Sequence, residues 1–140
     1  MEIKEKSSSG TIGRAISVFD GEVFPDLENS EIAIFGVNDS RGTGLLDVDI
    51  KMNVFRKCFY QLYMGSWDFK MIDLGDFKIG ENIDDTYFGL TDLISNLISI
   101  GVLPIILGGG HDLCYAVYKA YESFNRGVNI ASIDSKFDLI

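Results

Sequence analysis

Apolar side chains follow one another without alternation in several short runs, and these runs set the frame of the chain. Continuous runs cover residues 32–37, 102–107 and 128–133, and residues 69–74 read as a further strand. A continuous rather than an alternating apolar run is typical of a strand whose two faces are both buried. We therefore predict four buried strands, which along the chain are residues 32–37, 69–74, 102–107 and 128–133.

The segments between these strands carry a different period, with apolar residues three and four positions apart. This period predicts helices over about residues 48–63 and 112–124, and a long helix through residues 87–98 that follows the acidic stretch 82–85. Acidic residues in a first turn complement the helix dipole. Strands that alternate with helices predict a mainly parallel sheet with helices on both faces, which is a three-layer α/β/α fold.

The two ends of the chain depart from this regular series. Residues 1–30 are predicted as an irregular N-terminal segment, with a polar leader over 1–10 and a short irregular or hairpin-like part over 11–29. Residues 31–140 are predicted as one α/β domain. This domain ends directly after its fourth predicted strand without a covering helix, so we expect an incomplete sheet, the N-terminal part of a longer domain. An unfinished sheet also predicts association, for example as a homo-oligomer.

Composition narrows the choice of ligands and compartment. Apolar residues make up 46% of the 140 residues, which is enough to form a core, and the formal net charge is -9. Such an acidic chain is unsuited to nucleic acid or an anionic membrane, since both require a positive surface, whereas a small cationic substrate or a metal ion fits it. No apolar run is long enough to cross a bilayer, and we expect a cytoplasmic protein.

The two cysteines, Cys58 and Cys114, fall within apolar helical patterns. Their separation lacks the Cys-x-x-Cys spacing of a zinc site and suggests no disulfide framework. We expect two buried thiols, because free cysteine often behaves as a small core residue.

The residues that can carry chemistry lie where the predicted strands end, because ligands of open α/β sheets bind beyond those ends. His111 is the only histidine, and it directly follows the three glycines 108–110. Taken alone, it is either a metal ligand or a histidine that caps a helix or fills the core. The glycines lack the Gly-Lys-Ser/Thr of a phosphate-binding loop, and Asp112 would repel an anion, which disfavours a nucleotide site.

A second group of candidates follows the fourth apolar run. Asp134, Lys136 and Asp138 are spaced by two residues, so that their side chains lie on one side of an extended chain. Taken alone, this pattern is more often a solvated or salt-bridged loop. Together with His111, the two carboxylates offer nitrogen and oxygen ligands for a divalent ion such as Mn²⁺.

Four segments, taken in order, resemble the arginase/agmatinase/formimidoylglutamase family of ureohydrolases. Residues 107–113, Leu-Gly-Gly-Gly-His-Asp-Leu, are similar to the family's Leu-Gly-Gly-Asp-His-Ser-Leu, and residues 134–139, Asp-Ser-Lys-Phe-Asp-Leu, to its Asp-Ala-His-x-Asp-Leu. Residues 34–39 resemble the family's first strand and loop, and residues 72–76 its Asp-x-Gly-Asp segment. The resemblance thus extends from about residue 31 to the end of the sequence.

The resemblance implies an α/β/α fold with a binuclear manganese centre, in which a metal-bridging hydroxide attacks a guanidino or amidine carbon and releases urea or formamide. Carried over by position, His111 and Asp138 would bind the first Mn²⁺, and Asp134 would bridge both ions. Position 136 would supply an imidazole to the second ion.

The chain departs from the family at that position, where Lys136 stands in place of histidine. An ammonium group has no lone pair for a metal, so we expect Lys136 to replace the second ion electrostatically. A neutral amine would need a large fall in pKa, which nearby carboxylates oppose. Gly110 and Asp112 also replace the family's Asp and Ser beside His111. The family's remaining metal-ligating aspartates lie in a downstream motif that these 140 residues do not contain.

Two functions are compatible with this pattern. The first is an arginase-family metal-dependent hydrolase of the formimidoylglutamase, agmatinase or arginase type, which cleaves a linear amidine or guanidino C–N bond; here it is an N-terminal fragment with an altered metal site. The second is a catalytically inactive arginase-like binding or interaction protein in which Lys136 closes the former metal site through salt bridges.

Overall fold

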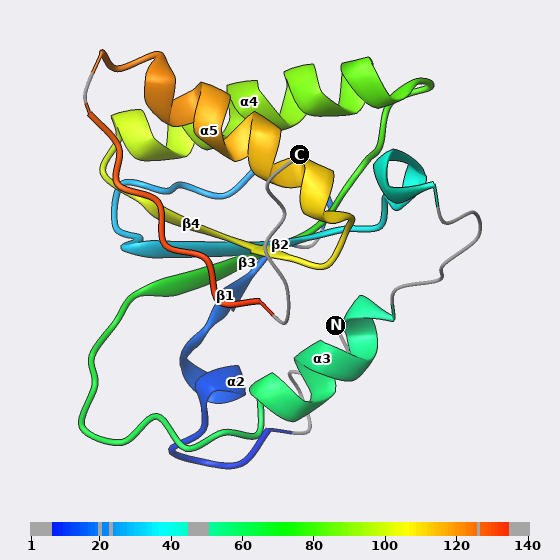
Figure 1. The fold of residues 1–140 in the computed structure, drawn as a ribbon. Helices are drawn as coiled ribbons and strands as arrows, with labels where there is room; N and C mark the ends of the chain where they lie inside the picture. The colour runs from blue at the N-terminus through cyan, green and yellow to red at the C-terminus, as the bar shows by residue number, and fades with distance from the viewer. Residues whose placement is uncertain (1–6, 20, 23, 45–50, 126, 135–140) are drawn as a thin grey trace.

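A computed structural model describes residues 7–19, 21–22, 24–44, 51–125 and 127–134 of the chain. Its centre is a four-stranded sheet in the order β1-β3-β2-β4 (Figure 1). The strands are β1 (Ser17–Val18), β2 (Ile32–Val37), β3 (Met71–Phe77) and β4 (Leu103–Leu107). Every pairing is parallel, so the carboxyl ends of the strands lie at one edge. The predicted parallel sheet is confirmed.

Helices cover both faces of this sheet (Figure 1). The helices are α2 (Ile12–Ala15), α3 (Met52–Phe59), α4 (Ile83–Ser99) and α5 (Cys114–Glu122), with 3₁₀ turns η1 (Arg41–Thr43) and η2 (His111–Leu113). The α4 and α5 helices lie over one face, and α2 and α3 lie over the other. The three-layer α/β/α prediction is confirmed.

Two apolar clusters hold the layers together, one on each side of the sheet. The larger cluster packs β2 and β3 against α4 and α5, through residues such as Phe35, Leu74, Leu90 and Ala116. The smaller cluster includes Ile16, Ile34 and Tyr60 on the opposite face. Phe35 and Ile34 are adjacent in β2 and both are buried, because successive strand residues point to opposite faces. This arrangement explains the continuous apolar run of β2.

The N-terminal segment differs from its prediction as an irregular or hairpin-like stretch. The β1 strand pairs with β3 in parallel, with Ser17 beside Ile72, so it extends the sheet instead of forming a hairpin. Glycines and a proline in this stretch concealed a two-residue strand, which is too short to leave an apolar run.

The prediction of a fourth strand at residues 128–133 is wrong. Residues 127–134 form no regular secondary structure, and Ile130 and Ile133 are exposed. A strand is defined by its pairing, and this segment pairs with no strand of the described sheet, whose order is β1-β3-β2-β4. An apolar run alone therefore did not produce one.

Both cysteines are exposed, which contradicts the predicted buried thiols. The buried residues of these helices include Arg56 in α3 and Ala116 in α5. Cys58 and Cys114 lie two positions away from these residues, which is more than half a helical turn, so they point away from the core. Within the described residues, no helix is long and apolar enough to cross a membrane.

Candidate functional site

The structure places His111 at the carboxyl edge of the sheet, directly after β4. Gly108 and Gly109 turn the chain with φ of 75° and 79°, a left-handed conformation that favours glycine, and His111 then begins η2. Its side chain is 55% exposed. The histidine is thus presented to solvent, and the prediction of a core histidine does not apply.

Two of the predicted site residues meet at this edge. His111 Nδ1 lies 3.3 Å from Asp134 Oδ2. The two residues line a hollow of about 400 Å³ together with the glycine turn. An adjoining hollow of about 760 Å³ runs from His111 and Asp112 to Gly42 and the segment 130–133. Lys136 and Asp138 lie outside the described residues.

The metal prediction is tested by the donors that the structure brings together. The described residues contain no group of three or more His, Cys, Asp or Glu side chains placed to hold an ion. His111 and Asp134 offer one imidazole nitrogen and one carboxylate, which fits part of the shell of a single divalent ion. The described part of the chain does not form a binuclear site.

A partly buried ion pair supports the loop after β2, on the neighbouring strand. Asp39 is 3% exposed, and its carboxylate accepts hydrogen bonds from Arg41 Nε at 2.9 Å and Nη2 at 2.7 Å. The Arg41 guanidinium also donates to the carbonyls of residues 80–82 and to Thr86 Oγ1. The hydrogen bond from Arg41 lowers the pKa of Asp39, although burial opposes this. The pair ties the loop to the start of α4.

A larger buried network anchors β3 to α3. Asp73 is fully buried and accepts hydrogen bonds from Arg56 Nε and Tyr60 Oη, both at 2.7 Å. Arg56 also donates to Asp76 Oδ1 at 2.7 Å and to the Gly75 carbonyl. Burial by itself would lower the pKa of Arg56, but the hydrogen bonds to Asp73 and Asp76 raise it overall. Burial, followed by the bond to Asp73, raises the pKa of Tyr60.

Sequence reasoning missed the arginines of both networks. Asp39, Asp73 and Asp76 stand out at strand ends, whereas Arg56 falls on the polar side of a helical pattern. Its carboxylate partners are 17 and 20 residues away in sequence. The available signal was an aspartate inside an apolar strand, because a buried carboxylate requires a positive partner.

Asp112 forms a third polar contact, immediately after His111. Its Oδ2 accepts a hydrogen bond from Tyr87 Oη of α4 at 2.8 Å. Its Oδ1 is buried and has no hydrogen-bond partner within the described part of the chain. Burial, and then the contact with Asp112, raises the pKa of Tyr87 to about 12, so the phenol remains a donor at neutral pH.

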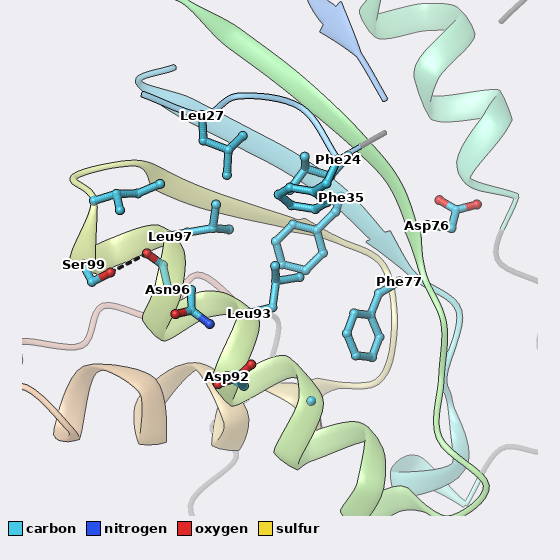
Figure 2. A pocket seen from close by; sticks show the side chains of 13 residues that line it. Phe24, Leu27, Phe35, Asp76, Phe77, Asp92, Leu93, Asn96, Leu97 and Ser99 are labelled. Carbon is cyan, nitrogen blue, oxygen red and sulfur yellow. Dashed lines mark hydrogen bonds between the residues drawn. The ribbon is translucent and has the colours of Figure 1, made fainter. Parts of the chain in front are cut away.

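A separate apolar hollow of about 590 Å³ lies beside α4 (Figure 2), and neither His111 nor Asp134 lines it. Phe24, Phe35 and Phe77 form its aromatic wall, and Asp92 and Asn96 of α4 also line it. It shares no lining residue with the hollow at the glycine turn, and no pattern along the chain predicted it.

Comparison with known proteins adds a family to this geometry. The arginase family model matches residues 31–140. A formimidoylglutamase of Geobacillus thermodenitrificans is 32% identical over 71 residues, which are 48% of this chain and 22% of that protein. This chain therefore matches well under half the length of its curated relative.

Two solved structures from Trypanosoma cruzi share the fold. An arginase superfamily protein superposes with a TM-score of 0.58 at 18% identity, and a formiminoglutamase with Mn²⁺ superposes with a TM-score of 0.55 at 16% identity. Each comparison covers 69% of this chain and 36% of the other. At these identities the likeness supports the fold.

Proposed function

Because the chain belongs to the arginase family, we propose that the protein is a metal-dependent hydrolase of the formimidoylglutamase type. The proposal is carried by the His111–Asp134 pair, which lies beyond the carboxyl ends of parallel strands. The formimidoylglutamase relative supports this type among the ureohydrolases. The reaction is cleavage of a linear amidine C–N bond by water.

His111, Asp134 and, by family position, Asp138 would hold the metal ion. A bound Mn²⁺ lowers the pKa of water and stabilises the charge that develops on the substrate. The Asp39–Arg41 pair holds the neighbouring loop against α4, which keeps one wall of the site in place. The hollow of about 760 Å³ beside His111 is within the size range of small-molecule sites.

The part of the substrate that suits this site is its amidinium group, which is a cation at neutral pH. The chain carries a net charge of -9, which attracts cations to its surface. An amidinium group donates several N–H bonds, and the acidic residues around the turn are acceptors.

A second function, that of a catalytically inactive binding protein, is favoured by Lys136. Lysine at the family's histidine position removes an imidazole and adds a positive charge. In this proposal Lys136 pairs with the carboxylates that would otherwise hold the second ion. The same site then takes a ligand without hydrolysing it.

The deciding experiment measures metal content and product release together. Full-length protein is purified without chelator, its manganese is counted by mass spectrometry, and formamide, urea and ammonia are assayed with formimidoylglutamate, agmatine and arginine. We expect about one tightly held Mn²⁺ per chain and turnover of formimidoylglutamate. His111→Ala removes both.

Lys136→His serves as the matched variant in the same assays. It restores the family's ligand, so manganese uptake increases towards two ions per full-length chain. Wild-type protein that contains no manganese and releases no product would sink the hydrolase proposal and leave the binding function.

A further inference from the structure

The Asp112 carboxylate is closely packed, but this packing does not stabilise the fold through both of its oxygens. Its Oδ1 is buried without a hydrogen-bond donor among the described residues, an arrangement that destabilises a folded chain. The residue therefore calls for a role other than packing.

Two glycines hold the Asp112 carboxylate in one place. A Cβ atom on Gly42 would overlap its Cγ and Oδ2, and a Cβ atom on Gly110 would overlap its Oδ1. The carboxylate is thus enclosed between the loop after β2 and the turn after β4. Gly110 also donates its backbone N–H to the Asp39 carbonyl at 2.8 Å, which joins the two loops a second time.

Tyr87 connects this enclosed carboxylate to α4. Its hydroxyl donates to Asp112 Oδ2 at 2.8 Å. Its ring packs edge-on against Tyr115 of α5, with the ring centroids 5.6 Å apart. The larger apolar cluster fixes α4, and α4 in turn fixes the position of the Tyr87 hydroxyl.

From these contacts we propose that Asp112 is a positioning residue for the candidate site. Through the Tyr87 hydroxyl it locks the glycine turn to α4, and the locked turn holds the His111 imidazole at the edge of the sheet, facing Asp134. The value of this device for catalysis rests on the proposed function. The lock itself does not, since it is formed by the residues of the turn and α4.

Two substitutions that each remove one phenol oxygen test the lock. Tyr87→Phe removes the donor to Asp112. Tyr115→Phe is the matched control, because the described structure records no hydrogen bond from its hydroxyl and the ring contact with Tyr87 is kept. The first readout is amide exchange at Gly110, whose N–H is bound to the Asp39 carbonyl.

We expect Gly110 exchange to accelerate at least tenfold in Tyr87→Phe, beyond any change at the core amides of β2 in the same variant, and to stay unchanged in Tyr115→Phe. Asp112→Ala behaves like Tyr87→Phe. Asp112→Asn restores slow exchange, because its amide oxygen still accepts from Tyr87. Equal exchange in Tyr87→Phe and Tyr115→Phe would overturn the lock.

The second readout uses Mn²⁺ alone and the chain's single histidine. Paramagnetic Mn²⁺ broadens the His111 ring resonances, and we expect Tyr87→Phe to need about tenfold more Mn²⁺ for half broadening, which is the scale of supports behind a metal ligand. Fast Gly110 exchange without any broadening in the wild type would keep the lock and reject the metal site. A broadening midpoint that does not differ between the two variants would reject the positioning role.

Discussion

At the scale of single residues, the side chains that matter most for stability are the buried charged ones and their partners. Asp73 is fully buried and would be unstable there alone, yet Arg56, Tyr60 and the Gly75 N–H satisfy it. Arg56 is itself 7% exposed, so each charge depends on the other. The network keeps both Asp73 and Asp76 paired with the Arg56 guanidinium.

Arg56→Ala therefore leaves the Asp73 carboxylate buried without its charged partner. We expect a loss of about 3–5 kcal/mol in the free energy of unfolding, the scale found when one partner of a buried pair is removed. Urea titration followed by circular dichroism measures it. Lys57→Ala, which removes an exposed charge from the same helix, should change the free energy by no more than about 0.5 kcal/mol. Equal losses in the two variants would contradict the proposed weight of the network.

At the scale of elements, sequence pattern predicted what one segment decides by itself. The long helix after residues 82–85 was foreseen, and α4 begins at Ile83 with Asn82 Oδ1 accepting from the Asp85 N–H at 2.8 Å. The orientation of α3 was not foreseen, because the pull of Arg56 toward carboxylates on β3 turns its apolar positions outward. Phe55 is 43% exposed for this reason.

Asn82→Ala tests the start of α4. Loss of the cap should lower the free energy of unfolding by about 1 kcal/mol. Asn96→Ala, an exposed position later in the same helix, is the control, and it should have little effect. The measurement is the thermal midpoint of each variant. A variant at position 82 as stable as the wild type would mean that contacts of Arg41 with residues 80–82 already fix this end.

At the scale of the whole molecule, pairing between distant segments limits what a sequence can reveal. The parallel direction of the strands followed from the alternation of strands and helices. The short β1 strand and the unpaired segment 127–134 depend instead on neighbours that no local pattern encodes. The candidate site shares this division. His111 and Asp134 were predicted from strand ends, but the supports from Arg41, Tyr87 and Arg56 were not.

The Asp39–Arg41 ion pair makes the stability of the molecule depend on pH in a definite direction. The pKa of Asp39 is lowered in the folded state, so its ion pair stabilises the fold fully above the ordinary value near 3.8 and loses this effect as the pH falls through that value toward the folded pKa. Asp39→Asn should therefore be less stable than the wild type at pH 7, with the difference shrinking below about pH 4. Asp92→Asn changes the net charge equally and is the control in urea titrations at both pH values. A gap at position 39 that persists at low pH would contradict this assignment.

The segment 127–134 adds a cost in chain entropy to the binding of a cation at the candidate site. Asp134 lies on a stretch that no sheet or helix restrains in the described structure, whereas His111 lies on a turn tied to two layers. Fixing one residue of such a stretch costs about 1–2 kcal/mol of chain entropy. A cation that joins the two side chains must therefore offset more chain entropy on the Asp134 side than on the His111 side, and this difference lowers its affinity.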